Sequence, residues 1–452
     1  MIEKNKEYDF DIIDNGMNFE GISKKDDKVV FIPGSITGEK VRAKVIKDTK
    51  SYSIAKLEEI YKISKDRVEP FCPSFKRCGG CSAEHIDYQK QIEQKRKFVL
   101  SNLMKNGIKD VNVENTIGMG MPYYYRNKVQ YPIRNIKGEN VIGFFSNRSH
   151  DIVSNNCCYI QNRVIDILAK NVFQILNENN FVGYNELEKK GEIKHLLIRR
   201  GYHTSEIMVV IIVSNENLAK DKRFEKVVKE ITNINKDIKS IFININESDT
   251  NEILGKNSFK LYGQDYITDC IGNYKYYISE KSFFQVNTIQ AELLYYTLKE
   301  NLDLKGNEVL FDLYAGVGSI GIFLSDKVSK IYGIEIEPQA VEMANLNINL
   351  NNVKNAEYVA GSVEDKIEEF SKRNIKPDVI VVDPPRRGLD EKSIEYIKRF
   401  NPEKIGYVSC NSATMARDLK LLLDKYEIIN IVPVDLFPHT SHVECVAVLK
   451  LK

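Results

Sequence analysis

Strands and helices alternate regularly over the last third of the chain, from about residue 287 to residue 452. Predicted strands occur at residues 308–311, 330–336, 357–360, 378–382, 404–409, 428–434 and 443–449, and helical stretches separate most of them. This alternation is typical of a doubly wound α/β domain with a largely parallel sheet. Residues 435–442 are too few for a helix, so we expect the last strand to run antiparallel to its neighbour and the seven-stranded sheet to be mixed.

A helix is predicted to precede the first of these strands. Asn287 can cap its N-terminus, and Gly306 is expected to end it. Ile289, Leu293 and Tyr296 recur along it at helical spacing.

The first strand leads into a Gly-x-Gly-x-x-Gly motif that begins with Gly316 and Gly318. Such a motif indicates an adenosine cofactor at a strand end, and Glu335 at the end of the second strand can accept both ribose hydroxyls. Asp312 places a carboxylate where the pyrophosphate of NAD would lie. That charge disfavours phosphate and favours the sulfonium and ammonium of S-adenosylmethionine. An NAD-dependent dehydrogenase is the alternative.

Three chemically active features fall at neighbouring strand ends. Cys410 follows the fifth strand, residues 383–386 (Asp-Pro-Pro-Arg) follow the fourth, and Glu444 begins the last. An isolated cysteine is more often a buried packing residue. At this edge of the sheet, where open α/β folds hold their active sites, a nucleophile is the better interpretation.

A thiol, a carboxylate and a methyl donor together suit methylation of a pyrimidine carbon. Uracil C5 is a poor nucleophile until a thiolate adds to C6 and forms an enolate. Cys410 would make this addition, and Glu444 would later remove the C5 proton so that the thiol can leave. A simple N- or O-methyltransferase needs no such thiol.

Length and composition set the wider limits. With 452 residues, 42% of them hydrophobic and 28% charged, the chain is expected to be a soluble protein of several domains. The net charge of +2 does not by itself indicate a polyanionic partner. The polar N-terminus and the lack of a long apolar stretch predict a cytoplasmic protein without membrane segments.

Three of the eight cysteines lie in one short loop. Cys72, Cys78 and Cys81 supply three thiols, and a fourth metal ligand would come from Cys157 or Cys158. Both structural zinc and a four-iron cluster take four ligands, so spacing alone leaves the metal open.

The first 60 residues contain short β-branched runs separated by turns, which predicts a small β-barrel. Apolar and basic residues alternate over residues 41–45, so Arg42 and Lys44 share one face. That face fits either a solvated strand or a phosphate-binding one.

Other cations also lie close to aromatic residues. A helix over residues 88–103 is expected to carry a basic face, and residues 123–270 have the mixed pattern of an α+β unit. The candidate RNA contacts are Lys76-Arg77, Lys95-Arg96-Lys97, residues 123–128 and Arg386-Arg387. Each of these alone is more often a solvated surface.

With these motifs, the sequence closely resembles the bacterial RNA 5-methyluridine methyltransferases, in the iron–sulfur branch that modifies 23S ribosomal RNA. The resemblance runs nearly end to end. Its motifs are Phe31 to Arg42, Phe283 to Asn287, Asp312 to Gly318, Asp383 to Gly388, Ser409 to Asn411 and Phe437 to Glu444.

The resemblance implies three parts of the chain. These are an N-terminal OB-like TRAM barrel (residues 1–64), a central α+β iron–sulfur domain (65–270) and a class I, Rossmann-like S-adenosylmethionine methyltransferase domain (271–452). Residues 90–122 are expected to pack on the last of these.

The resemblance also assigns roles. Cys410 is then the nucleophile and Glu444 the base, and Cys158 completes a [4Fe–4S] ligand set because Gln161 follows it at the family's spacing. The residues implied to contact S-adenosylmethionine or the uracil edge are Gln285, Tyr314, Glu335 and Asp383. Ser412 stands where relatives usually carry proline, which is expected to loosen the loop behind Cys410.

The implied substrate is RNA, 23S ribosomal RNA in this branch, and the protein is expected to act as a monomer. Transfer RNA is the alternative substrate. A non-catalytic RNA-binding protein of ribosome assembly is the alternative function, and Cys410 with Glu444 argues against it.

Overall fold

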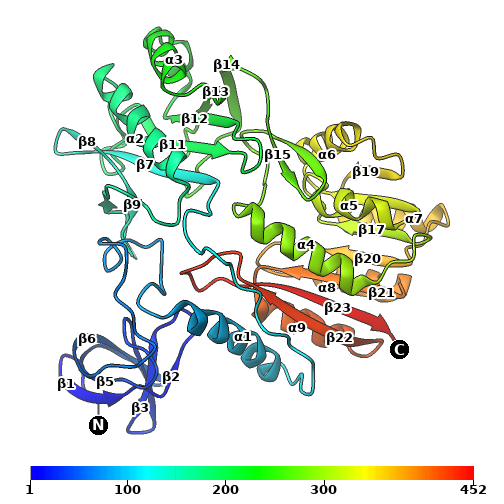
Figure 1. Cartoon of the computed structure of the whole chain (residues 1–452), viewed down its shortest axis with the longest axis horizontal. Coiled ribbons are helices and arrows are strands. Elements are labelled where there is room, and N and C mark those ends of the chain that lie inside the picture. The colour runs from blue at the N-terminus through cyan, green and yellow to red at the C-terminus, as the bar shows by residue number, and fades with distance from the viewer. Residues whose placement is uncertain (1, 148) are drawn as a thin grey trace.

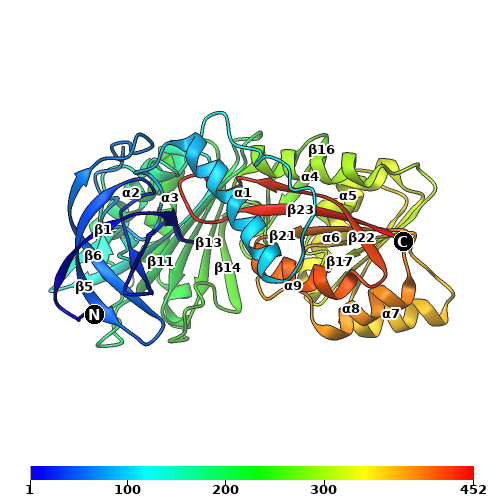
Figure 2. The same cartoon turned by 90° about the horizontal axis from the view of Figure 1, so that it is seen from below.

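The computed structural model describes residues 2–147 and 149–452. Three larger sheets succeed one another along the chain: an N-terminal sheet, a central sheet and a C-terminal α/β sheet (Figures 1 and 2).

The C-terminal sheet has the seven strands that the sequence predicts. Their order is β19-β18-β17-β20-β21-β23-β22, and β23 runs antiparallel to both of its neighbours. The predicted mixed sheet is therefore confirmed. The strands are β17 (Val309–Leu313), β18 (Lys330–Glu335), β19 (Ala356–Ala360), β20 (Val379–Val382), β21 (Lys404–Ser409), β22 (Tyr426–Val434) and β23 (Glu444–Leu451).

Helices cover both faces of this sheet, which buries its nearly continuous apolar strands. One face packs against α4 to α6 and the other against α7 to α9. Their bounds are α4 (Thr288–Leu302), α5 (Ser319–Leu324), α6 (Pro338–Leu350), α7 (Val363–Lys372), α8 (Glu391–Phe400) and α9 (Ser412–Leu422), with a short 3₁₀ turn at Ser325–Lys327.

Helix α4 is capped as predicted but buries a different face. The Asn287 side chain accepts a hydrogen bond from Gln290 N, and the helix ends at Leu302, before Gly306. Leu293 and Tyr296 are 38% and 42% exposed. Leu294, Tyr295, Leu298 and Leu302 face the core instead. Two apolar stripes share this helix, and packing against the sheet selects one of them.

The N-terminal sheet has the strand order β1-β5-β6-β4-β3-β2. Its strands are β1 (Glu7–Asp11), β2 (Asp14–Asn15), β3 (Gly21–Lys25), β4 (Lys28–Ile32), β5 (Lys40–Asp48) and β6 (Tyr52–Lys62). The alternation predicted over residues 41–45 is present: Val41, Ala43 and Val45 are fully buried in the core. Arg42 is exposed and pairs with Asp9 at 3.2 Å.

The central sheet has the order β14-β13-β12-β11-β7-β8. It comprises β7 (Lys128–Ile136), β8 (Glu139–Ile142), β11 (Ile193–Arg200), β12 (Ile207–Val213), β13 (Ile238–Ile245) and β14 (Asn257–Gly263). Helices α2 (Arg163–Glu178) and α3 (Arg223–Ile234) pack on one face, and a 3₁₀ turn spans Glu216–Lys220. A small ribbon pairs β9 (Phe144–Phe145) with β10 (Ile152–Val153).

Two segments join the central and C-terminal parts. The hairpin of β15 (Ile267–Ile271) and β16 (Tyr274–Ile278) contains the predicted boundary at 270/271, and its side chains share one core with both sheets. Helix α1 (Tyr88–Lys105) packs along α9, and the chain after it runs beside β22 (Figure 2). Within residues 2–147 and 149–452, no helix has the combination of length and hydropathy needed to cross a bilayer.

Candidate functional site

Strand register brings Cys410 and Glu444 together. In the antiparallel pair β21–β23, Ser409 lies opposite Cys445, so Cys410 and Glu444 are the next residues at this edge of the sheet. Asp383 follows β20, the parallel neighbour of β21, and reaches the same edge. We call Asp383, Arg386, Cys410 and Glu444 the rim site. It unites the reactive groups that the sequence places at three separate strand ends.

Hydrogen bonds tie two loops of the rim site to each other. Asn411 Nδ2 and Thr414 Oγ1 both donate to the Arg386 carbonyl, at 3.1 and 3.2 Å. Ser412 was expected to loosen the loop behind Cys410, but its hydroxyl accepts a 2.9 Å hydrogen bond from Asn102 Nδ2 of α1. The freedom that serine gains over proline is offset by this anchor.

Burial and neighbouring carboxylates together set the electrostatics of the rim site. Burial, and then the nearby Asp383, raise the pKa of Glu444 to about 8, while Arg386 acts in the opposite direction. Burial, followed by the charges of Glu444 and Asp383, raises the pKa of the Cys410 thiol to about 11. The pKa of Asp383 rises to about 7 through burial and Asp312. The site therefore favours an added positive charge, such as a sulfonium.

The glycine motif forms a tight turn after β17. Tyr314, Gly316 and Gly318 all have positive φ, of 61°, 54° and 77°. Such backbone is uncommon for a tyrosine, and strain of this kind concentrates at functional sites. Glu335 Oε2 accepts a 2.9 Å hydrogen bond from Gly316 N, which brings the end of β18 to the turn.

Asp312 supports this turn from inside. It is buried, and its Oδ2 accepts hydrogen bonds from Gly321 N at 3.0 Å and from Tyr358 Oη at 3.1 Å. Burial raises its pKa to about 7. These bonds give Asp312 a positioning role for the glycine turn.

Gln285 is buried at the start of the segment that leads into α4. Its carbonyl accepts a 3.0 Å hydrogen bond from Asn127 Nδ2, which also donates to Thr288 Oγ1. The central sheet therefore positions the Gln285 segment.

Cys72, Cys78, Cys81 and Cys158 line one cavity of about 60 Å³, which we call the cysteine cavity. Cys157 is not among its lining residues. In the part of the chain that the structure describes, no three His, Cys, Asp or Glu side chains converge closely enough for a single metal ion. The cavity therefore gathers four thiols, but it does not present a one-ion site.

The chemistry of these thiols fits a metal cluster. Burial raises the pKa of Cys81 well above its usual value and that of Cys158 to about 12. Four protonated thiols in one enclosed place need a cation to become good ligands, because a bound metal favours the thiolate. Four cysteine thiolates are the ordinary ligand set of a [4Fe–4S] centre.

A loop over residues 435–442 connects the rim site and the cysteine cavity. The residues that hold this loop in place could not be predicted from the sequence. Lys95 Nζ of α1 forms a fully buried ion pair with Asp435 at 2.6 Å and donates to Phe437 O at 3.1 Å. The His439 carbonyl accepts from Ser82 N and Ala83 N, next to the cysteine loop. The available signal was that Lys95 stands four residues before Val99, on the apolar stripe of its helix.

Several predicted RNA contacts are corrected by these interactions. Lys95 is buried, and Arg96 donates to the carbonyls of Val113 and Glu114, so neither lies free on a basic face. Tyr125 is also buried, and its hydroxyl donates to Pro438 O. Five cations among the predicted RNA contacts are exposed: Lys76, Arg77, Lys97, Arg386 and Arg387.

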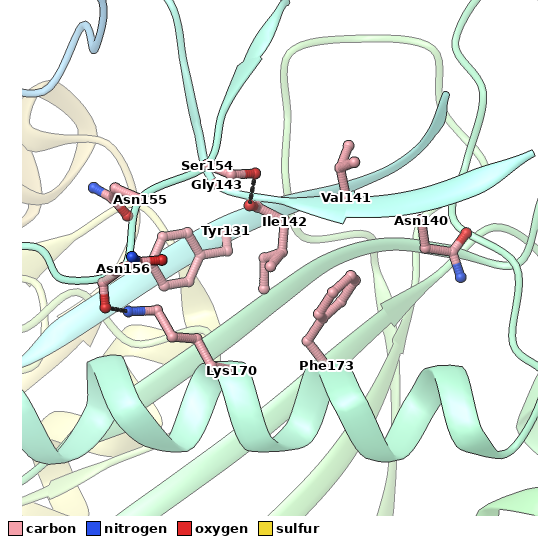
Figure 3. Close-up of a pocket in the computed structure, with 10 residues that line it drawn as sticks. All are labelled: Tyr131, Asn140, Val141, Ile142, Gly143, Ser154, Asn155, Asn156, Lys170 and Phe173. Atoms are coloured by element: carbon pink, nitrogen blue, oxygen red, sulfur yellow. Dashed lines mark hydrogen bonds between the residues drawn. The ribbon is translucent and has the colours of Figure 1, made fainter. Parts of the chain in front are cut away.

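A second cavity, of about 290 Å³, lies between β8 and α2 (Figure 3). Ser154 Oγ donates to Ile142 O at 2.7 Å, and Lys170 contacts the Asn156 carbonyl and pairs with Asp166. Ser154 and Lys170 of this cavity therefore already have hydrogen-bond or ion-pair partners within the protein. Asn155 lines both this cavity and the cysteine cavity.

Comparison with known proteins agrees with this geometry. The profile of the tRNA (Uracil-5-)-methyltransferase family matches residues 87–452. An uncharacterized RNA methyltransferase of Clostridium acetobutylicum is 42% identical, over 99% of this chain and 98% of its own. An uncharacterized RNA methyltransferase of Staphylococcus epidermidis is 39% identical, over 100% of this chain and 99% of its own.

A solved structure also aligns over almost the whole chain. It is the tRNA (uracil-54, C5)-methyltransferase of Pyrococcus abyssi in complex with S-adenosyl-L-homocysteine. The match has a TM-score of 0.78 and 28% identity, and it covers 98% of this chain and 100% of that one.

Proposed function

Because this chain belongs to the tRNA (uracil-5-)-methyltransferase family, it is an S-adenosylmethionine-dependent RNA uracil-C5 methyltransferase, and we propose that it forms 5-methyluridine through Cys410 and Glu444. The observation that carries the mechanism is the register of β21 and β23. It sets a half-buried thiol beside a buried carboxylate at one sheet edge.

In this mechanism the Cys410 thiolate adds to uracil C6, and the C5–C6 double bond becomes an enolate. S-adenosylmethionine supplies the methyl group that C5 accepts. Glu444 then takes the C5 proton, and the electrons of that C–H bond reform the double bond while the C6–S bond breaks. Arg386 favours the thiolate of Cys410, because its charge lowers the pKa that the carboxylates raise.

The cofactor would lie over the glycine turn. We assign Tyr314, Gly316, Gly318 and Glu335 to its binding, with Asp312 holding the turn. Asp383 and Gln285 are assigned to the methionine end or the uracil edge. The carboxylate density of the rim site supports binding of a cationic cofactor.

We further propose that Cys72, Cys78, Cys81 and Cys158 hold a [4Fe–4S] cluster with a structural role. Support comes from the four thiols that line one cavity. Their loop also donates two backbone hydrogen bonds to His439, five residues before Glu444.

For the substrate we propose 23S ribosomal RNA, with a monomeric enzyme acting in the cytoplasm. Residues 1–64 would serve as a TRAM-like RNA-binding barrel, 65–270 as the cluster domain and 271–452 as the catalytic domain. The N-terminal sheet and the four cysteines support the ribosomal branch. Transfer RNA is the second candidate, because the Pyrococcus abyssi match is named as a tRNA enzyme.

RNA that contains 5-fluorouridine tests the mechanism. Its C5 fluorine cannot leave as a proton, so wild-type protein should form a denaturant-stable complex linked through Cys410. Glu444→Gln should trap the same kind of adduct with ordinary RNA after methyl transfer. Mass spectrometry would locate the linkage, and the absence of any adduct in both cases would refute the covalent route.

A comparison of cells with and without the gene tests the substrate. Mapping 5-methyluridine in both RNA classes should show a site lost from 23S ribosomal RNA. Loss from transfer RNA alone would establish the second candidate instead.

A further inference from the structure

Three cations lie close together where the central sheet meets the Gln285 segment. Lys128 of β7 and Arg199 of β11 are directly opposite each other in the antiparallel register. Arg126 lies two residues before Lys128 and lines the cysteine cavity. Like charges directly opposite each other destabilise a sheet.

The charges of this group are poorly balanced. In the described part of the chain, the Lys128 side chain forms no ion pair or hydrogen bond, and burial followed by the charges of Arg199 and Arg126 lowers its pKa to about 7. Arg199 is 6% exposed; it donates to the Glu280 carbonyl at 3.4 Å, and its Nε lacks a partner. The Glu280 carboxylate favours the Arg199 charge, which burial disfavours.

Arg126 also has a buried donor without a hydrogen-bond partner. Its Nε is buried without a hydrogen-bond partner, and its guanidinium lies 5.8 Å from the centre of the Phe437 ring. Its charge also reaches His442, whose pKa burial and nearby cations, Arg386 among them, lower to about 4. His442 therefore lies within the field of both Arg126 and Arg386.

The group is tied to the Gln285 segment through Asn127. Asn127 lies between Arg126 and Lys128 in the sequence and donates to the Gln285 carbonyl and to Thr288. A ligand held by these cations would be fixed relative to the Gln285 segment.

We propose that Lys128, Arg199 and Arg126 form a phosphate site that binds the RNA backbone beside the target uridine. The inference rests on the RNA substrate of the proposed function. A phosphodiester supplies the negative charge that the group lacks, and phosphate contacts fix the register of a nucleic acid on a protein. Anchoring the backbone here would orient the uracil toward Cys410.

Binding of a uridine-containing RNA hairpin, measured from 50 to 200 mM KCl, tests this site. Lys128→Ala should weaken binding roughly tenfold and reduce the slope of log Kd against log salt by about 0.7–0.9, the value for one phosphate contact. Lys226→Ala, on α3 at the opposite face of the sheet and paired with Glu230, is the matched control and should change neither quantity.

A scan of RNAs that each carry one neutral methylphosphonate identifies the phosphate. One position should weaken binding to wild-type protein and have no effect on Lys128→Ala. Removing one of three clustered cations relieves repulsion, so the variant should melt at the same temperature as wild type or higher. Lys128→Gln provides a second neutral replacement of similar length.

The proposal would be overturned if Lys128→Ala and Lys128→Gln both left the slope of log Kd against log salt unchanged. It would also be overturned if their methylphosphonate pattern were identical to that of wild type. The assay needs no methyl transfer. Failure of the proposed mechanism would appear as missing 5-methyluridine or missing adduct, while the binding result would stand by itself.

Discussion

The rim site and the cysteine cavity both hold thiols with raised pKa, yet they are built for different chemistry. At the rim, one half-buried thiol faces two carboxylates and Arg386. In the cavity, four thiols face one another and the buried Glu84. One half-buried thiol with acid–base neighbours suits a nucleophile, whereas four enclosed thiols suit metal ligation.

The two regions are mechanically connected through the 435–442 loop. Ser82 and Ala83 hold His439 from the cysteine side, and Lys95 holds Asp435 from α1. Loss of a thiol from the cysteine cavity should therefore lower the activity of the rim site. Removal of Cys410 should leave the cysteine cavity and its iron content unchanged. The predictions below test this asymmetry.

The largest effect is expected for Cys410→Ala. Without addition at C6, uracil C5 is not nucleophilic, so methyl transfer should fall by at least roughly 10⁴-fold. RNA binding, S-adenosylmethionine binding and iron content should all remain. Cys445→Ala, one residue beyond Glu444 and fully buried, is the control and should keep most of the activity. Substantial methylation by Cys410→Ala would return this cysteine to a packing role.

Lys95→Met should give the next largest effect. It leaves the Asp435 carboxylate buried without its cation, and breaking such a pair costs about 3–5 kcal/mol of stability. The double variant Lys95→Met/Asp435→Asn removes the uncompensated charge and should recover part of the loss. Chemical denaturation measures both. An equal loss in the single and double variants would show that the ion pair does not hold this loop.

Cys158→Ala tests the cavity itself. Anaerobically purified protein should lose its brown colour and its iron, whereas Cys157→Ala should retain both. Because the cysteine loop holds His439, methyl transfer should fall by something of the order of 10²-fold, the effect of misplacing a reacting group by about 1 Å. One zinc per chain in colourless wild-type protein would contradict the cluster assignment.

Residues next to strand ends could be placed from the sequence because chain connectivity and strand order bring them together. Cys410, Asp383 and Glu444 each adjoin a strand of the predicted sheet, so the topology alone implied a shared edge. Lys95 could not be matched to its partner, since Asp435 lies 340 residues away and only the packing of α1 brings them together. For the same reason, the apolar spacing of Ile289, Leu293 and Tyr296 could not show which face of α4 is buried, because the sheet decides that face.

The smallest effect concerns pH and stability at the rim. The pKa of Glu444 is about 8 in the folded protein, above its ordinary value, so the folded state binds this proton more tightly than the unfolded chain does. Its contribution to stability is complete below the unfolded pKa and is lost as pH rises through about 8. Above that pH an ionised Glu444 lies buried beside Asp383. Glutamine stays neutral, so Glu444→Gln should melt higher than wild type at pH 9, with a smaller difference at pH 6.

A change of about 1 kcal/mol corresponds to a shift of roughly 2–4 °C in melting temperature for domains of this size. The exposed Glu395→Gln on α8 is the matched control, because its side chain is already hydrated in both states. If both variants respond equally to pH, the carboxylates of the rim are not crowded in solution. If only Glu444→Gln responds, the rim site keeps an unfavourable buried carboxylate. In the bound state, the sulfonium of S-adenosylmethionine would supply the positive charge that this site lacks.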